Sequence, residues 1–228
     1  MKRLLILFVA TTFMGIFSSC DLDDDDYYSL DNAWVGFGLV KKEVSATSFT
    51  ILMDDGEVLY PSANSGLVND VFNNERVWVN FTILGNKENP DHNEYYYVKI
   101  NSLRKILYKG IFTITPEKED SIGNDPIRVA DKWIKNDILN FELQYRGGNE
   151  THFINLVKAP GNIDVTNGPV LLELRHNNND DTGYIPLSGV VSFDLSALKI
   201  PGKTSTPFKI TAKGFDGETF EYTGEYKY

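Results

Sequence analysis

The residue whose surroundings most clearly predict a chemical reaction is Cys20, the only cysteine of the 228-residue chain. Two basic residues precede an apolar run over residues 4–17, and two serines lead into the thiol. A basic start, an apolar run and small residues before a cleavage point are typical of a secretory signal. The run is too short for a membrane-spanning helix, which needs about 20 apolar residues. We therefore expect residues 1–19 to be removed as a signal peptide.

The position of Cys20 also predicts the fate of its thiol. A pair of small residues directly before a lone cysteine is the pattern at which the thiol receives a diacylglyceryl group before the signal is cut. Phe17 stands where a leucine is usual, which affects the expected efficiency of cleavage and not the class of signal. The alternative is a thiol buried in a core, and a place next to an apolar signal run argues against it. Cys20 is thus the predicted lipidation site, with palmitate among its acyl chains, and the membrane is the predicted partner.

The chain that remains is strongly acidic. Loss of Lys2 and Arg3 with the signal changes the formal net charge from -10 to -12. Because an acidic surface repels phosphates, we expect no nucleic-acid partner. Six acids precede Trp34, namely Asp21, Asp23, Asp24, Asp25, Asp26 and Asp31. Such a block repels itself and extends, so residues 20–33 are predicted to be an acidic tether. It is either a solvated spacer or a signal for transfer to the cell surface.

From Trp34 onward, apolar and polar residues alternate in short runs, which is typical of β-strands. In residues 76–83, four apolar side chains share one face, those of Val77, Val79, Phe81 and Ile83. Further strands are expected at 34–40, 48–53, 57–60, 94–100 and 110–115. Between two of them, Asp54-Asp55-Gly56 predicts a hairpin turn, because glycine accepts the positive φ that the reversal needs.

A polar stretch over residues 117–125 interrupts this pattern, and we place a domain boundary between residues 115 and 116. A short helix is expected near Val129–Ile134. Strands then follow at 139–145, 151–158, 170–176, 188–195, 206–213 and 218–226. Six or seven antiparallel strands over about 110 residues are typical of a β-sandwich. The sequence thus predicts an all-β protein with domains at 34–115 and 116–228 and, with one cysteine, no internal disulfide.

Several segments together resemble a known family: Asp54-Asp55-Gly56, Arg76–Ile83, Asp120–Pro126, His152–Val157, Leu172–Asn177 and Phe215–Glu218. In this order they resemble the NigD-like lipoprotein family over nearly all of the chain after the signal. The resemblance implies an N-terminal OB-like barrel followed by a C-terminal antiparallel β-sandwich, on an outer-membrane lipoprotein of Gram-negative bacteria. The family is named from a bacteriocin operon, in which a member was proposed as an immunity protein. The resemblance carries over no catalytic or binding residue.

The motifs of common enzymes are missing from the sequence. It has no Gly-x-Ser-x-Gly elbow, and lipid occupies the sole thiol, which argues against serine-elbow and cysteine nucleophiles. Paired carboxylates for glycoside hydrolysis remain open, because two such acids meet only in the fold. We expect no enzyme, no catalytic residue and no cofactor.

Two groups of side chains carry atoms that could bind a metal. His92, His152 and His176 lack the short spacing of a metal-binding helix, and histidines in strands are expected to be cross-strand hydrogen-bond partners. The loop Asn177–Gly183 is rich in oxygen atoms, which suits either calcium or a plain polar turn, and it lacks an EF-hand register. The polar turn is the expectation, and no metal site is predicted.

Two other groups of side chains could form binding surfaces. Tyr95-Tyr96-Tyr97 must divide between two faces of a strand, so that either Tyr96 or its two neighbours face the core, and outward rings could stack on a sugar. Lys99, Arg104, Lys105 and Lys109 could meet an acidic partner or form a solvated face.

The sequence therefore predicts a non-enzymatic, lipid-anchored outer-membrane protein that binds or protects, in the manner proposed for bacteriocin immunity. The alternative is an accessory binding subunit of a surface complex that handles glycans or proteins. The sequence leaves open whether the protein or glycan partner is met at the cell surface or in the periplasm.

Overall fold

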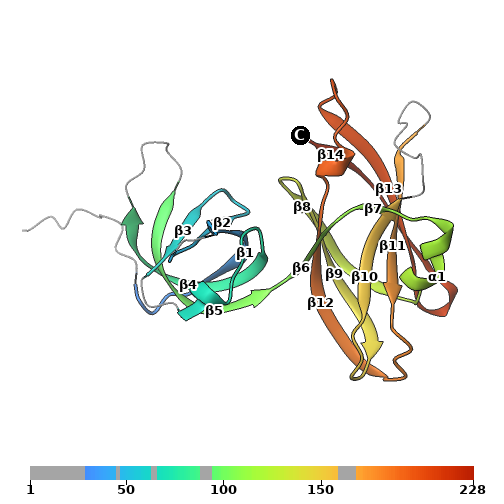
Figure 1. Ribbon diagram of the computed structural model, residues 1–228, viewed down its shortest axis with the longest axis horizontal. Helices are drawn as coiled ribbons and strands as arrows, with labels where there is room; N and C mark the ends of the chain where they lie inside the picture. Colours follow the sequence, from blue (N-terminus) through green and yellow to red (C-terminus); the bar gives the residue numbers. More distant parts are fainter. Residues whose placement is uncertain (1–28, 45–46, 63–65, 88–93, 159–167) are drawn as a thin grey trace, which may run out of the picture.

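The computed structural model describes residues 29–44, 47–62, 66–87, 94–158 and 168–228 (Figure 1). The expected signal peptide, Cys20, most of the acidic tether and His92 lie outside these residues. Within the described ranges, no helix has the length and apolar character needed to cross a membrane.

The N-terminal part is a closed barrel with the strand order β1-β2-β3-β5-β4. Its strands are β1 (Trp34–Lys41), β2 (Thr50–Met53), β3 (Val58–Pro61), β4 (Arg76–Lys87) and β5 (Tyr95–Lys105), and a short 3-10 turn, η1, covers Gly66–Asn69. All pairs are antiparallel except β3 with β5. A five-stranded closed barrel is the OB-like architecture that was expected.

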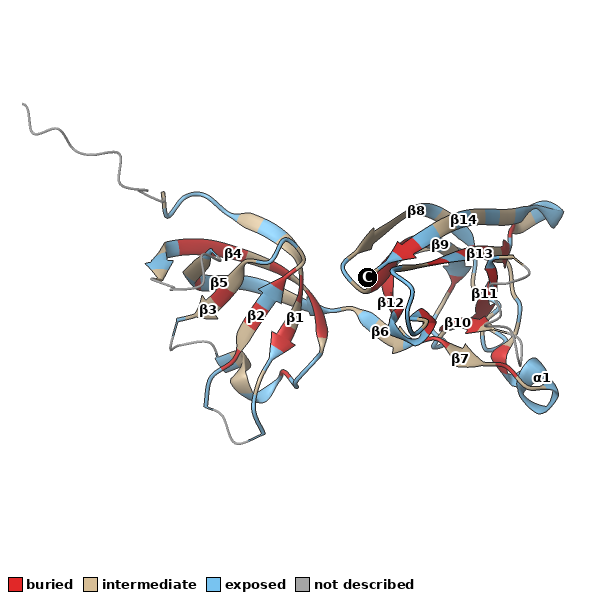
Figure 2. Cartoon of the chain, turned by 90° about the horizontal axis from the view of Figure 1, so that it is seen from above, coloured by how far each residue is buried: buried red, intermediate tan, exposed pale blue. Residues whose placement is uncertain are grey.

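Apolar side chains fill the inside of this barrel, and Figure 2 marks buried positions along β4 in red. β4 turns Val77, Val79, Phe81 and Ile83 inward, as the alternation predicted, and Val98 of β5 packs against them. The predicted hairpin at Asp54-Asp55-Gly56 joins β2 to β3, and Gly56 has a φ of 96°. The barrel is therefore a packed core and not a pore.

The C-terminal part is a sandwich of two sheets, ordered β14-β13-β11-β10-β7 and β6-β12-β9-β8 (Figure 1). The strands are β6 (Leu107–Gly110), β7 (Phe112–Thr113), β8 (Arg128–Lys135), β9 (Ile138–Gly147), β10 (Phe153–Lys158), β11 (Val170–Asn177), β12 (Ile185–Asp194), β13 (Ser205–Lys213) and β14 (Thr219–Lys227). The helical pieces are η2 (Pro116–Lys118), α1 (Glu119–Ile122), η4 (Ser196–Leu198) and η5 (Phe215–Gly217). The expected all-β fold, a barrel followed by a sandwich, is confirmed.

Apolar side chains of the two sheets form one core between them. Phe141 and Phe193 of one sheet pack edge to face, with ring centroids 6.2 Å apart, and Phe208 and Leu156 of the other sheet are buried in the same cluster. The sandwich is mainly antiparallel, but β6 with β12, β7 with β10 and β11 with β13 run parallel.

The division between barrel and sandwich differs from the sequence-based boundary at 115/116. The chain passes from β5 through Ile106 into β6, which pairs with β12, and β7 pairs with β10. Both short strands therefore belong to the sandwich, and the barrel ends before them. The polar stretch after Pro116 interrupted the strand pattern because it forms η2 and α1, which lie within the C-terminal part.

The helix expected near Val129–Ile134 is wrong, because these residues form the edge strand β8. A bulge between Val129 and Asp131 shifts the register against β9. The shift places Val129 and Ile134, five positions apart, against the same core. It therefore removed the simple alternation that would have predicted a strand.

Barrel and sandwich meet at a polar junction that centres on Arg76 of β4, whose side chain is fully buried. Its guanidinium forms a bidentate ion pair with Asp54 of the barrel's hairpin turn. Its Nη2 also donates to Oδ1 of Asn140 in β9, at 3.2 Å, and Ser192 donates to the same oxygen at 2.7 Å. The junction thus links the start of β4 to the middle of the sandwich.

Contacts at the rim of the junction come from two turns and from one pair of aromatic rings. Lys135 pairs with Asp55, and Asn136 Nδ2 donates to the carbonyl oxygen of Asp54 at 3.0 Å. Phe37 of β1 packs on Trp133 of β8, with ring centroids 5.7 Å apart. The hairpin turn predicted from the sequence therefore serves as a contact surface as well as a reversal.

Candidate functional site

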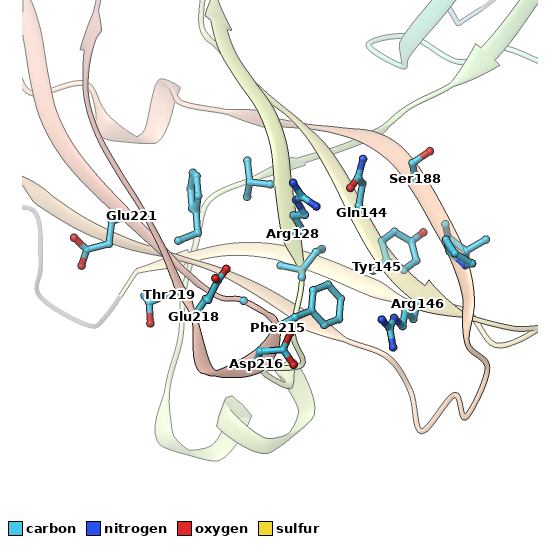
Figure 3. A pocket seen from close by; sticks show the side chains of 16 residues that line it. Arg128, Gln144, Tyr145, Arg146, Ser188, Phe215, Asp216, Glu218, Thr219 and Glu221 are labelled. Atoms are coloured by element: carbon cyan, nitrogen blue, oxygen red, sulfur yellow. The ribbon is translucent and has the colours of Figure 1, made fainter.

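A groove with a volume of about 1000 Å³ opens along one side of the sandwich (Figure 3). It lies between the N-terminal halves of β8 and β14, which are the edge strands of the two sheets. Its other walls come from the end of β9, the start of β12 and the turn between β13 and β14. A cavity of this size is in the range of pockets that hold small molecules or short chain segments.

The inner wall of the groove is apolar. Ile127 is buried there, and Val129, Tyr145, Leu187 and Phe220 are half-buried. Val129, Tyr145 and Phe220 also pack against the sandwich core, so their positions are fixed by the fold. Such a surface favours the burial of an apolar part of a ligand.

The rim carries charges of both signs. Arg128 and Arg146 come from the β8 and β9 side, whereas Asp216, Glu218 and Glu221 come from the opposite side (Figure 3). Neither arginine forms an ion pair with any described residue. The groove therefore offers cationic donors on one wall and carboxylate acceptors on the other.

One aromatic contact bridges the two sides. The guanidinium carbon of Arg146 lies 5.7 Å from the ring centroid of Phe215, at the tip of the β13–β14 turn. Asp216 and Gly217 both have positive φ, 56° and 81°, and they form that tip. The contact is exposed, and a cation–π interaction at such a site contributes about 0.5–1 kcal/mol. A ligand can therefore displace it at little cost.

A buried pair of histidines lies beside the groove wall. The ring of Tyr145 is 4.9 Å from that of His152 and 5.3 Å from that of His176, measured between centroids. His152 Nδ1 and His176 Nε2 are 2.9 Å apart, which is the cross-strand hydrogen bond expected of strand histidines. The other ring nitrogen of His152 faces Oδ2 of Asp181 at 3.2 Å.

The oxygen-rich loop Asn177–Gly183 turns its main acid inward. The carboxylate of Asp181 accepts hydrogen bonds from the backbone N–H groups of Gly183, at 2.7 Å, and Gly148, at 2.6 Å. These donors lower the pKa of Asp181 to about 2, since they stabilise its charged form. The loop is thus a hydrogen-bonded turn, and no group of metal-ligating side chains occurs among the described residues.

The tyrosine run resolves in favour of one of its two alternatives. Tyr96 packs against the barrel core, so Tyr95 and Tyr97 lie on the outer face of β5. The ring of Tyr60 in β3 lies 5.6 Å from that of Tyr95 and 6.2 Å from that of Tyr97. Lys87 places its Nζ 3.3 Å from the centroid of Tyr60. These side chains form a small aromatic surface, which we call the tyrosine patch.

The four basic residues do not form one surface. Lys105 pairs with Glu75, Arg104 lies over the ring of Trp78, and Lys99 is exposed on β5. Lys109 belongs to the sandwich, where its Nζ donates to Oδ1 of Asn155 at 2.9 Å. Its partial burial lowers the pKa of Lys109. An acidic partner for the set as a whole is therefore not supported.

Sequence reasoning did not find the groove. Neither Arg146 nor Phe215 was predicted to bind a ligand, and Phe215 stood only within a family segment. The signal that could have pointed to them is their position in two turns, since binding residues are concentrated in loops on a rigid scaffold. Strand pairing decides which turns face each other, and a single sequence does not reveal that pairing.

Comparison with known proteins gives matches over both parts of the chain. The NigD-like N-terminal OB domain model matches residues 37–106, and the NigD-like C-terminal beta sandwich domain model matches residues 110–226. Both matched ranges agree with the division seen in the structure. No curated protein matches the chain.

Solved structures share the fold over most of their length. A provisionally named toxin-related protein from Parabacteroides distasonis is 28% identical, with a TM-score of 0.71, over 86% of this chain and 94% of that one. A NigD-like immunity protein from Bacteroides caccae is 21% identical, with a TM-score of 0.63, over 88% and 99%. A provisionally named lipoprotein from Bacteroides fragilis is 15% identical, with a TM-score of 0.62, over 86% and 98%.

The two matched domains follow each other in the order that the resemblance implied, and together they cover the barrel and the sandwich. The resemblance drawn from the sequence is thereby confirmed, and the chain belongs to the NigD-like family.

Proposed function

We propose that this protein is a lipid-anchored binding protein of the outer membrane, which captures a peptide segment in the sandwich groove and thereby protects the cell, as an immunity protein does. The observation that carries this proposal is the groove itself, with an apolar inner wall and a rim of both charges. An extended peptide offers the matching set of groups, because it has apolar side chains, both charges and backbone donors and acceptors.

The anchor follows from the sequence around Cys20. A lipidated cysteine followed by an extended acidic tether holds the barrel away from the membrane. The name of the Bacteroides fragilis relative is consistent with this anchor. Cys20→Ser is expected to leave the protein uncleaved or unlipidated and absent from the outer-membrane fraction, as read by immunoblot. A variant that remains in the outer membrane would contradict the anchor without bearing on the groove.

The buried Asp181–His152–His176 series supports a binding role and not hydrolysis. In a hydrolytic triad the histidine that the carboxylate orients faces a nucleophilic hydroxyl or thiol. Here the far nitrogen of the series, Nδ1 of His176, faces the carbonyl oxygen of Pro126 at 3.2 Å. A carbonyl oxygen is no nucleophile, and both histidines are enclosed by the fold.

The alternative is an accessory subunit that binds glycans, and the tyrosine patch favours it. Tyr97 is 46% exposed, and an exposed tyrosine ring can stack on the apolar face of a sugar. The patch lies on the barrel and the groove lies in the sandwich, so the two functions depend on different residues. Substitution therefore separates them.

The experiment uses the mature chain with Cys20→Ser in two parallel selections. A phage library of random peptides is panned on it, and an array of bacterial oligosaccharides is probed with it. If the groove binds peptides, panning is expected to yield peptides that bind the parent. Their affinity for Arg146→Ala should be at least about tenfold lower, a loss of about 1.4 kcal/mol. Arg104→Ala is the matched control, because that arginine lies on the barrel.

The outcomes separate the two functions. Peptides that still bind Arg146→Ala and Phe215→Ala at parental affinity would place binding outside the groove and overturn the proposal. Oligosaccharide binding that disappears with Tyr97→Ala and survives Arg146→Ala would establish the glycan function in its place.

A further inference from the structure

The histidine pair beside the groove faces hydrogen-bond acceptors at both of its outer ends. His152 Nε2 lies 3.2 Å from Oδ2 of Asp181, and His176 Nδ1 lies 3.2 Å from the carbonyl oxygen of Pro126. The carbonyl oxygen accepts hydrogen bonds only. The carboxylate is also limited to accepting, because the N–H groups of Gly148 and Gly183 hold it in its charged form. Each outer nitrogen must therefore carry a hydrogen atom.

The two inner nitrogens, His152 Nδ1 and His176 Nε2, are 2.9 Å apart, and one hydrogen atom joins them. If neither inner nitrogen carried a hydrogen atom, their two lone pairs would face each other. If both carried one, the two hydrogen atoms would collide. The four nitrogens thus carry three hydrogen atoms, whereas two neutral imidazoles carry only two. The geometry requires one extra proton.

We propose that His152 and His176 share one extra proton at neutral pH, and that entry of a further proton in acid weakens peptide binding in the adjoining groove. The effect on binding rests on the proposed function, whereas the protonation of the pair does not. The side chains of Asp181 and His152 are 5% and 4% exposed, and His176 is 2% exposed, so water does not replace the missing hydrogen bonds.

A fourth proton is disfavoured for two physical reasons. Burial lowers the pKa of His176, and the charge on His152 lowers it further. A fourth proton would also replace the hydrogen bond between the rings with a contact between two N–H groups. The pair of rings therefore holds one extra proton and disfavours a second.

The groups around the pair come from several elements. Asp181 faces His152, and the charge of Asp125, which precedes β8, offsets only part of the lowering of the His176 pKa that burial causes. Tyr145 of β9 stacks on both rings. Arg175, next to His176 in β11, is directed away from the pair toward Glu119 and Glu173. The facing charged side chains are thus acidic, which favours the single positive charge.

The link to the groove is Tyr145, whose ring contacts both imidazoles and lines the groove. Its neighbour Arg146 carries the rim charge. When a fourth proton breaks the bond between the rings, the support behind Tyr145 is lost. Because burial lowers the pKa of His176, binding in the groove is expected to weaken only when the pH falls below the ordinary range of histidine.

The decisive measurement is a nitrogen-15 NMR titration of the histidine rings in the mature chain with Cys20→Ser and His92→Gln. His152→Gln and His176→Gln assign the signals. At pH 7 the pair is expected to show three protonated nitrogens, and a fourth only in acid. Two protonated nitrogens at pH 7 would overturn the proposal, whether or not any peptide ligand exists.

The second measurement concerns the groove, with the peptides selected above as probes. Between pH 7 and pH 4 their affinity is expected to fall about tenfold for the parent, and to stay within about twofold for His176→Gln, which removes one of the two rings. Equal pH dependence in both proteins would overturn the link to binding while leaving the proton count intact. If no peptide is found, the proposed function fails and the NMR result still decides the protonation.

Discussion

Arg76 of the barrel and Asn140 of the sandwich are joined by a hydrogen bond of 3.2 Å, and both residues are almost fully buried. Asn140 in turn accepts from Ser192, so the guanidinium, the amide and the hydroxyl form one connected set. Only Nε of Arg76, among the buried side-chain polar atoms of the described residues, lacks a partner. The position of the barrel on the sandwich is thus fixed by polar geometry.

Arg76→Ala is expected to lower the free energy of unfolding by about 3 kcal/mol, because it leaves Asp54 and Asn140 without their shared partner. Arg104→Ala, which removes an exposed arginine, is the matched control and should cost about 0.5 kcal/mol or less. Urea unfolding followed by tryptophan fluorescence measures both. Equal effects would mean that the junction contributes nothing to stability.

Two fragments test where the sandwich begins. Residues 107–228 contain β6 and β7, and are expected to fold, whereas residues 116–228 lack both strands and should not. The shorter fragment also loses Ile111 from the sandwich core. Circular dichroism and amide dispersion in NMR spectra distinguish the two results. A folded shorter fragment would show that the pairings of β6 and β7 are dispensable.

Asp181→Asn tests the acid dependence of the inward-turned loop. The pKa of Asp181 is about 2 in the folded protein and near 3.9 when unfolded, so its contribution to stability is complete above about pH 4 and is lost as the pH falls toward 2. The parent should therefore lose stability more steeply than Asp181→Asn over that range. Asp180→Asn is the control, since asparagine also accepts the positive φ of that position. Parallel curves for the parent and Asp181→Asn would refute the role of the carboxylate.

Gly183→Ala tests the close approach of the loop to the end of β9. A Cβ at this position would lie 2.3 Å from the backbone nitrogen of Gly148 and 2.4 Å from the carbonyl carbon of Gly147. Backbone atoms must then move, which typically costs about 1–3 kcal/mol. Gly189→Ala is the control, because nothing lies within 4 Å of a Cβ there. Thermal unfolding should separate the two variants, and similar melting temperatures would contradict the packing.

The sequence was most informative where one element had one clear face. The alternation over residues 76–83 predicted which side of β4 is buried, and Asp54-Asp55-Gly56 predicted the turn between β2 and β3. Both features depend on local geometry. β8 was missed since its bulge interrupts the alternation. The groove was missed since Arg146 and Phe215 meet only after β9 and the β13–β14 turn are placed on opposite sheets. The resemblance supplied the order of barrel and sandwich, which periodicity alone does not determine.

The short strand β6 also has a mechanical consequence. It continues from the barrel and runs parallel to β12 over four residue pairs (Figure 1). A pull that reaches the sandwich from the barrel side acts along this strand, so it loads the whole ladder in shear. In a parallel pair the hydrogen bonds are evenly spaced along the strands, so such a load is shared among them. The sandwich is therefore built to resist tension arriving from the N-terminal side.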